Sequence, residues 1–273
     1  MARPLRIDRI LANLGYGSRA DAKTLIARHR VRINGVVVDR PEQTAHSDTV
    51  TLDQEPLDHP NGILVVAHKP VGLVCSHDER EGPLVFDLVP PRWLLRNPKV
   101  VTAGRLDKDS SGLIVITDDY QLVHRLTSPK RHVEKLYEVT VDSAISDELI
   151  SRFASGELLL NDDPVPCRPA PVTLLGPGRA LVTLTEGRNR QLRRMFQACG
   201  LHVDTLHRLS FGPWELGDLA EGRWMDVRVP DPHSRPDGKE QSGSSDGPDV
   251  YVAGAVVDAG AIVEAGPEPT NEL

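Results

Sequence analysis

The sequence predicts an α+β protein with a small helix–helix–hairpin domain, a larger domain on a mixed or antiparallel sheet, and a disordered tail. Two amphipathic helical segments before a hairpin signal predict the small domain, and strand-like runs with few helices predict the larger one. The regular alternation of strands and helices that is typical of a doubly wound sheet is missing. A chain of 273 residues suits about two domains. We place the boundaries at residues 1–59, 60–230 and 231–273.

The N-terminal segment predicts two helices. Apolar side chains in residues 7–14 recur with helical spacing, and Gly15 follows them as a helix end. Ser18, with Asp21 three residues later, matches a capping box. A second helix is therefore expected to begin there and to run to about Arg28.

A β-hairpin is expected after these helices. Asn34-Gly35 lies between the apolar segments 31–33 and 36–38, which is a strong signal for two strands joined by a type I′ turn. The polar, turn-forming residues 58–62 then predict a linker. Residues 1–40 hold nine basic and three acidic side chains, so this unit carries a net charge of +6.

The middle of the chain predicts one sheet-based domain with a sizeable core. Strands are expected at 63–67, 100–103, 113–117, 136–141 and 180–185. Helices are expected near 121–126, 146–153 and 189–198. Strand runs mixed with a few helices indicate an α+β domain.

The formal net charge of −7 comes from the last part of the chain. Residues 231–273 hold two basic and nine acidic side chains, whereas residues 1–230 are neutral. The same segment is rich in Pro, Gly, Ser and Asp, so it cannot bury enough apolar area to fold, and we expect it to be disordered. The acidic total therefore does not exclude a nucleic-acid partner.

Other bulk features limit the class of protein. No apolar run is long enough to span a membrane, and the N-terminus lacks the apolar segment of a secretory signal. Cys75, Cys167 and Cys199 are odd in number and too far apart to indicate a disulfide framework or a zinc site. We expect a soluble, cytoplasmic protein.

The most informative stretch is 104–113, Gly-Arg-Leu-Asp-Lys-Asp-Ser-Ser-Gly-Leu, between two predicted strands. Polar groups at strand ends are often catalytic, although Asp and Ser also form plain turns by bonding their own backbone. Asp107, Asp109 and Asp118 match positions of a calcium loop, but strands rather than helices flank them. A magnesium-dependent aspartyl-phosphate hydrolase is disfavoured because its nucleophile would directly follow the strand, whereas Gly104 and Arg105 intervene here.

Two further clusters carry positive charge. Residues 186–196 contain four arginines within seven positions, and arginine favours phosphate or carboxylate partners. Residues 129–137 place three cations just before Tyr137 at a strand start, which suits an unstacked base and its phosphates. Taken alone, each cluster is also compatible with a solvated helix face or a core aromatic residue.

Together these segments resemble the ordered motifs of the pseudouridine synthases. The motifs are G-R-L-D-x-D-S-S-G-L, T-S-P-x-x-x-x-E-K-x-Y and E-G-R-N-R-Q-L-R-R-M-F, in that order. Residues 1–57 resemble the S4 RNA-binding domain, including S-R-A-D-A-x-x-L-I at the start of the second helix. The resemblance covers about residues 1–228 and is strongest to the branch that modifies ribosomal RNA.

The resemblance implies a role for each matched residue. Asp107 is implied to be the nucleophile that attacks the target uridine covalently, at C1′ of the ribose or at C6 of the base. Tyr137 is implied to stack on the uracil, Arg193 to pair with Asp107, and Arg105 to position the RNA. The base then detaches, turns and rejoins its sugar through carbon, with no cofactor and no metal.

The implied substrate is a uridine of ribosomal RNA, free or within a ribosomal-subunit assembly intermediate. The T-S-P segment favours small-subunit (16S) rRNA, whereas Asn189-Arg190 also occurs among large-subunit (23S) enzymes. We expect a monomeric isomerase, and the alternative is a non-catalytic rRNA-binding assembly factor. RNA contacts are expected from clustered cations, namely Arg19, Lys23, Arg28, Arg30, Arg32, Lys130, Arg131, Arg188 and Arg190.

Overall fold

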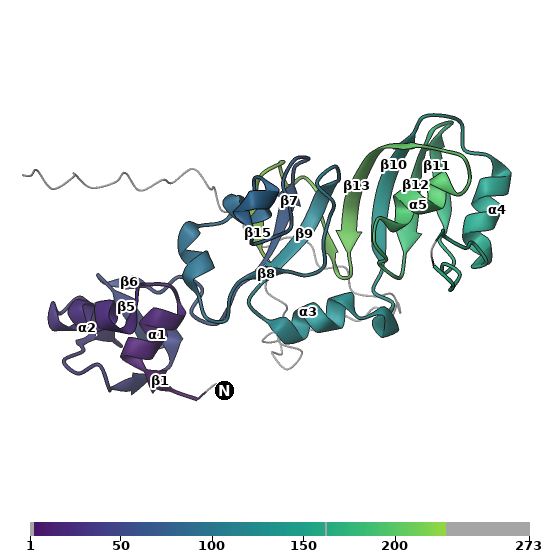
Figure 1. Ribbon diagram of the computed structural model, residues 1–273. Helices are drawn as coiled ribbons and strands as arrows, with labels where there is room; N and C mark the ends of the chain where they lie inside the picture. Colours follow the sequence, from purple (N-terminus) through teal and green to yellow (C-terminus); the bar gives the residue numbers. More distant parts are fainter. Residues whose placement is uncertain (1–2, 162, 228–273) are drawn as a thin grey trace, which may run out of the picture.

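The computed structural model describes residues 3–161 and 163–227, and Figure 1 shows a small N-terminal domain beside a larger sheet. The predicted disordered tail, residues 231–273, lies outside the described residues. Within the described ranges, no helix is long and apolar enough to cross a membrane.

The small domain has the predicted order of two helices and a hairpin. Strands β3, β2, β5 and β6 form one antiparallel sheet, and β1 pairs with β4. The helices pack their apolar faces on a core of their own. The elements are β1 (Leu5–Arg6), α1 (Ile7–Asn13), α2 (Arg19–Ala27), β2 (Val31–Ile33), β3 (Val36–Val37), β4 (Thr44–Ala45), β5 (Val50–Leu52) and β6 (Glu55–Pro56).

Two local predictions for this domain are confirmed. The Ser18 hydroxyl accepts a hydrogen bond from the Asp21 N–H at 3.2 Å, and the Asp21 carboxylate accepts one from the Ser18 N–H at 2.8 Å. Asn34 and Gly35 have φ values of 47° and 82°, as a type I′ turn between β2 and β3 requires. The capping box and the turn therefore set the start of α2 and the hairpin register.

A buried carboxylate lies in the first turn of α1. Asp8 is fully buried and accepts hydrogen bonds from Arg6 Nε at 3.1 Å and from Arg19 Nη2 at 2.9 Å. The hydrogen bond from Arg6 outweighs desolvation, so the pKa of Asp8 lies below its ordinary value of 3.8. Arg19 therefore ties α2 to the start of α1.

Replacing Asp8 by Asn should lower the free energy of unfolding at neutral pH by about 1–2 kcal/mol, because charge-assisted hydrogen bonds are lost. A carboxyl with a depressed folded pKa stabilises the protein in full above 3.8 and loses this contribution as the pH falls below that value. The free energies of unfolding of the variant and the wild type, measured with urea, should therefore converge as the pH falls.

Asp39→Asn is the control. It removes an exposed carboxylate that lies 3.7 Å from Arg40, so little change in the free energy of unfolding is expected. A D8N deficit that stays constant at low pH contradicts this assignment.

The larger domain contains every predicted strand and helix of this part of the chain, each within about two residues of its expected ends. Strands β11, β13, β14 and β15 are additional. The elements are β7 (Leu64–Lys69), β8 (Val101–Thr102), β9 (Ser111–Thr117), α3 (Tyr120–Thr127), β10 (Lys135–Val141), α4 (Asp147–Ser155), β11 (Val172–Gly176), β12 (Arg179–Leu184), α5 (Gln191–Gln197), β13 (Val203–Phe211), β14 (Trp214–Glu215) and β15 (Trp224–Asp226).

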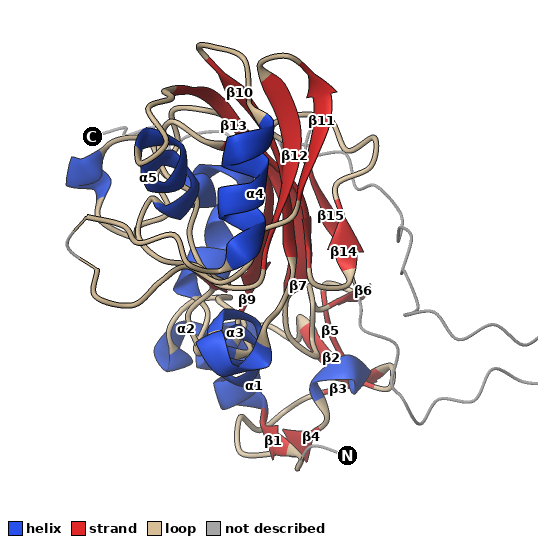
Figure 2. Cartoon of the chain, turned by 90° about the vertical axis from the view of Figure 1, so that its right-hand side faces the viewer, coloured by secondary structure: helices blue, strands red, loops and turns tan. Residues whose placement is uncertain are grey.

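These strands form one mixed sheet in the order β11-β12-β10-β13-β9-β7-β15, with β8 beside β9 and β14 beside β13. The described pairings are antiparallel except that of β13 with β9. Alternate side chains face two cores. Val65 and Ile114 lie in one core with α4 and α5, which cover that face in Figure 2, and Val66 and Val115 lie in the other. The predicted fold class is confirmed.

The parallel pairing joins the two halves of this sheet at a close backbone contact. Its register places Gly112 of β9 opposite Arg208 of β13. Gly112 has a φ of +105°, and a Cβ there would lie 2.3 Å from the Arg208 carbonyl oxygen. Both the backbone conformation and the lack of space require glycine. The second glycine of the 104–113 motif therefore closes the sheet just after the loop that carries Asp107.

The two domains are docked through residues on both sides of the predicted linker. Asn97 donates its backbone N–H to the Asn13 carbonyl at 2.8 Å, and the Arg92 guanidinium lies 4.5 Å over the Tyr16 ring. Tyr16 Oη accepts a hydrogen bond from the Asp58 backbone N–H at 2.8 Å, and Arg92 donates to the Asp58 carboxylate at 2.5 Å. The linker is therefore held between the two domains.

Candidate active site

The sequence clusters singled out for their chemistry meet at one pocket of about 400 Å³ in the larger domain. The pocket lies between the β8–β9 loop, the end of α3, the start of β10, the β12–α5 loop and the second half of β13. Arg105, Asp107 and Tyr137 line it, and Arg193 lies in an adjoining groove. A cavity of this size suits a small ligand such as one nucleotide.

Asp107 lies on the β8–β9 loop and is partly exposed to the pocket. Its Oδ2 is 3.6 Å from Arg190 Nη1, while Arg190 Nη2 donates to the Asp109 carboxylate at 2.9 Å. Arg190 occupies the position before α5 with a left-handed backbone conformation. One guanidinium therefore contacts both carboxylates of the loop.

The expected ion pair between Arg193 and Asp107 is not formed. Arg193 donates to the Asp109 carbonyl at 2.9 Å and to the Val203 carbonyl at 2.8 Å, and its Nη2 is 3.3 Å from the Asp109 carboxylate. The guanidinium of Arg193 is thus bonded to Val203 at the start of β13 and to Asp109, rather than to Asp107. Arg190, one helical turn earlier, takes the place beside Asp107.

Asp109 holds both arginines against the β8–β9 loop. Burial raises its pKa, but the hydrogen bond from Arg190 and the charges of Arg193 and Arg190 outweigh burial, so the pKa lies below 3.8. Asp109 is therefore a charged partner that keeps two cations at the pocket edge.

A buried lysine that the sequence analysis does not single out supports the loop from the sheet side. Lys69, at the end of β7, is fully buried and donates to the Ser110 carbonyl at 2.6 Å and the Pro70 carbonyl at 3.0 Å. Burial lowers the pKa of Lys69, although the charges of Asp109 and Asp107 act against burial. Its ammonium fixes the end of the loop.

Tyr137 lies on β10 and is 8% exposed, with its side chain at the pocket. Two further cations line the pocket: Lys135 on the same strand, which belongs to the predicted cation cluster 129–137 but was not assigned to the site, and Arg208 on β13, which sequence reasoning missed. Arg208 is 2% exposed, donates Nε to the Leu113 carbonyl at 2.7 Å and lies 4.9 Å over the Phe211 ring. The register explains the grouping, because Tyr137 pairs with Arg208 across β10 and β13.

Arg188 is bonded within the protein. It donates to Asp163 at 2.9 Å, to the carbonyls of Val165 and Pro166 at 2.6 Å, and to Glu186 at 3.3 Å. It therefore fixes the segment after α4 against the pocket edge, and its guanidinium is not presented freely for the expected RNA contact.

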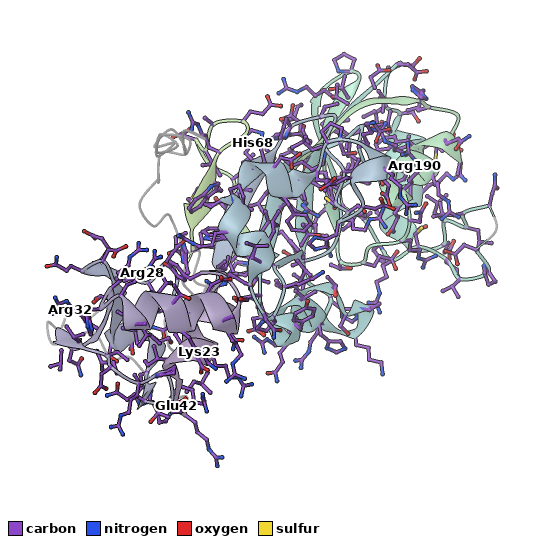
Figure 3. All side chains as sticks on the ribbon, turned by 60° about the vertical axis from the view of Figure 1, so that its left-hand side comes forward. Lys23, Arg28, Arg32, Glu42, His68 and Arg190 are labelled. Carbon is purple, nitrogen blue, oxygen red and sulfur yellow. The ribbon has the colours of Figure 1, made fainter. Side chains whose placement is uncertain are left out.

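The other cations expected to bind RNA divide into a bonded group, of which Arg19 and Arg30 are also exposed, and an exposed group without such bonds among the described residues. Figure 3 places Lys23, Arg28 and Arg32 on the small domain and Arg190 on the larger one. The exposed group comprises Lys23, Arg28, Lys130, Arg131 and the positioning candidate Arg105. In the bonded group, Arg19 contacts Asp8, Arg30 contacts Asp53, and Arg32 donates to the Gly35 carbonyl at 3.0 Å.

Asp118, the last position of the calcium-loop alternative, is bonded to groups outside the loop that carries Asp107. Its carboxylate accepts a hydrogen bond from the Ile63 N–H at 2.8 Å and lies 3.2 Å from Arg96. Among residues 3–161 and 163–227, no group of three or more His, Cys, Asp or Glu side chains is placed to hold a metal ion. Asp118 is therefore a structural partner of the β7 start.

Comparison with known proteins matches both domains. The S4 domain pattern matches residues 5–51, and the pattern described as RNA pseudouridylate synthase matches residues 63–198. The chain is 37% identical over 225 residues to ribosomal small subunit pseudouridine synthase A of Escherichia coli K12, covering 81% of this chain and 95% of the relative. It is 35% identical over 234 residues to an uncharacterized RNA pseudouridine synthase, YtzG, of Bacillus subtilis, covering 84% and 97%.

A solved structure agrees with these sequence matches. The crystal structure of a pseudouridylate synthase superposes with a TM-score of 0.57 at 34% identity, covering 82% of this chain and 96% of that one. An S4 domain joined to a domain that matches an RNA-modifying synthase defines this chain as an enzyme that acts on RNA. The chain belongs to the RNA pseudouridylate synthase family, whose members are isomerases that form pseudouridine from uridine.

Proposed function

We propose that this enzyme converts one uridine of small-subunit (16S) rRNA to pseudouridine, with Asp107 as the nucleophile. The observation that carries the proposal is the pocket that holds Asp107, Tyr137 and Arg190 together. Similarity over 225 residues to a relative named for the small ribosomal subunit supports 16S over 23S rRNA. A carboxylate facing RNA phosphates has no use in a non-catalytic assembly factor, so we disfavour that alternative.

We further assign residues 1–59 as the RNA anchor, residues 60–230 as the catalytic domain, and a cytoplasmic monomer as the working form. Separate apolar cores in the two parts support the division. The substrate in this proposal is rRNA that is still assembling, because an irregular, partly folded region exposes a uridine most easily.

Asp107 and Tyr137 have different roles in the proposed reaction. Asp107 is a weak nucleophile in water, so its attack depends on an extruded uridine being held against it. Extrusion costs roughly a few kcal/mol, and the Tyr137 ring offers a face on which the extruded base stacks. Attack at C1′ and attack at C6 both place the nucleotide between these two side chains.

Purified protein incubated with protein-free 16S rRNA, protein-free 23S rRNA and partly assembled small subunits tests the proposal. Carbodiimide-dependent stops in reverse transcription map each pseudouridine. We expect a single new site in 16S rRNA, formed fastest in the assembling subunit. A site confined to 23S rRNA overturns the 16S assignment, and no product on any RNA overturns the proposed function.

Replacing both Lys23 and Arg28 by Ala should weaken RNA binding without slowing the conversion of bound RNA. Both side chains are exposed on or just after α2, so each can contact one phosphate. Losing two phosphate contacts should reduce the slope of log affinity against log salt by about 2. Filter binding across a salt series measures this, with Lys99→Ala, an exposed residue before β8, as the control. An unchanged slope removes these side chains from the anchor.

A further inference from the structure

A lysine amine lies inside the catalytic pocket, on the strand that carries Tyr137. Lys135 and Tyr137 are two residues apart on β10, so they share one face of the sheet, and both line the cavity. Lys135 Nζ donates to the Val133 carbonyl at 2.9 Å and lies 5.2 Å from the centre of the Phe211 ring. The amine is thus partly buried over an aromatic ring and retains further positions for a ligand.

Charged groups on three neighbouring elements line the pocket that holds this amine. Arg208 approaches from β13, Glu186 from the loop after β12, and Asp107 lines the same pocket from the β8–β9 loop. Burial lowers the pKa of Lys135 most, Arg208 lowers it further and Glu186 opposes them, which leaves a pKa of about 8. A usable fraction of Lys135 is therefore a neutral amine near neutral pH.

Arg208 is suited to keep that amine neutral. Its guanidinium cannot lose its proton in a protein, and its position is fixed by the Leu113 carbonyl and the Phe211 ring. A permanent, immobile cation disfavours a second positive charge beside it. Arg208 and Lys135 therefore differ from two surface cations, because Arg208 keeps its positive charge whereas Lys135 can become neutral.

The isomerisation requires a proton acceptor that the residues assigned so far do not supply. The C1′–N1 bond breaks and a C1′–C5 bond forms, while C5 still carries its hydrogen. That C5–H bond must break, with its electron pair restoring the C5=C6 double bond, and N1 must gain a proton. Arg190 and Arg208 have no lone pair to accept a proton. After attack at C6, Asp107 is still bonded to the base at this stage. After attack at C1′, formation of the C1′–C5 bond breaks the Asp107–C1′ bond and releases a carboxylate, which is a weaker base than a neutral amine.

We propose that the neutral amine of Lys135 accepts the C5 proton of the re-attached base, an inference that rests on the proposed pseudouridine chemistry. The Nζ lone pair takes the proton and becomes an ammonium near Glu186. It then releases a proton to solvent while N1 takes one up, so atoms and charge balance and the amine is restored. A base that titrates near the working pH is effective in such a transfer.

Lys135→Arg tests the proposal because it keeps a cation but cannot accept a proton. Single-turnover conversion is measured on RNA that carries either uridine or [5-²H]uridine at the mapped site. The single-turnover rate of the variant should fall by about 10²–10⁴-fold with RNA affinity retained, and its primary deuterium isotope effect should exceed that of the wild type.

The pH dependence is a further readout. The wild-type rate should rise with pH to a plateau above a pKa of about 8, and the variant should lack this rise. Lys99→Arg, outside the pocket, should match the wild type.

Lys135→Ala provides a second readout, because it leaves room for a small amine. Added methylamine should restore turnover in proportion to the free amine. A slow K135R enzyme with the wild-type isotope ratio, together with no amine rescue of K135A, assigns Lys135 a structural role and overturns the proposal, as does K135R turning over at the wild-type rate. A wild-type protein that forms no pseudouridine contradicts the proposed function instead, so the two failures are distinct.

Discussion

Asp107→Asn should abolish pseudouridine formation while leaving RNA binding nearly intact, the largest effect we expect from one substitution. The amide has the shape of the carboxylate but does not act as a nucleophile, so the single-turnover rate should fall at least about 10³-fold, or about 4 kcal/mol of transition-state stabilisation. The Asp107 side chain is 30% exposed and its contact with Arg190 is 3.6 Å long, so the fold should lose little. Nucleoside analysis of the RNA and filter binding measure the two effects separately.

Asp218→Asn is the matched control for this experiment. Asp218 is exposed between β14 and β15, away from the pocket, and its replacement should leave both rate and affinity unchanged. Turnover retained by D107N excludes Asp107 as the nucleophile. Loss of RNA binding together with turnover indicates instead that the carboxylate maintains the structure of the loop.

Gly112→Ala should have the largest effect on stability. The new Cβ would lie 2.3 Å from the Arg208 carbonyl oxygen and 2.5 Å from its nitrogen, and a φ of +105° is strained for any L side chain. Backbone strain and overpacking together should lower the free energy of unfolding by about 3–5 kcal/mol. That loss is a large fraction of the stability of an ordinary domain, so the midpoint of urea unfolding should shift strongly.

Gly176→Ala is the control for this prediction. Gly176 ends β11 at the sheet edge, and no heavy atom would lie within 4 Å of a Cβ added there. Its free energy of unfolding should stay close to that of the wild type. A G112A protein as stable as G176A would mean that β9 and β13 do not approach each other as closely as described.

Elements with local chemical signals could be predicted from the sequence. Ser18 and Asp21 supply each other's hydrogen bonds within one turn, and Asn34-Gly35 tolerates the backbone of the hairpin turn without help from distant residues. Strand β13 could not be predicted in this way. His207 and Arg208 interrupt its apolar pattern, and their partners come from the distant strand β9.

The same distinction applies to the site. Asp107 and Tyr137 belong to sequence motifs, so their place at the pocket follows from recognisable patterns. Arg208 was missed, and Lys135 was counted only within a cluster of cations, because charged side chains are normally exposed, and the pairing of β10 with β13 brings both to one pocket. Sequence spacing also does not say whether Arg190 or Arg193 reaches Asp107, because Arg190, just before α5, and Arg193, on α5, both contact the same loop.

The docked junction between the domains has a consequence for how a target is selected. Asn97 on Asn13 and Arg92 over Tyr16 hold the small domain at a fixed distance from the catalytic pocket. Under the proposed function, RNA bound at the small domain meets the pocket as an intramolecular event, but only where the span between the two contacts matches the fixed separation. Three-dimensional distance within the folded RNA, rather than base sequence around the uridine alone, then decides which uridine is modified and at which stage of RNA folding.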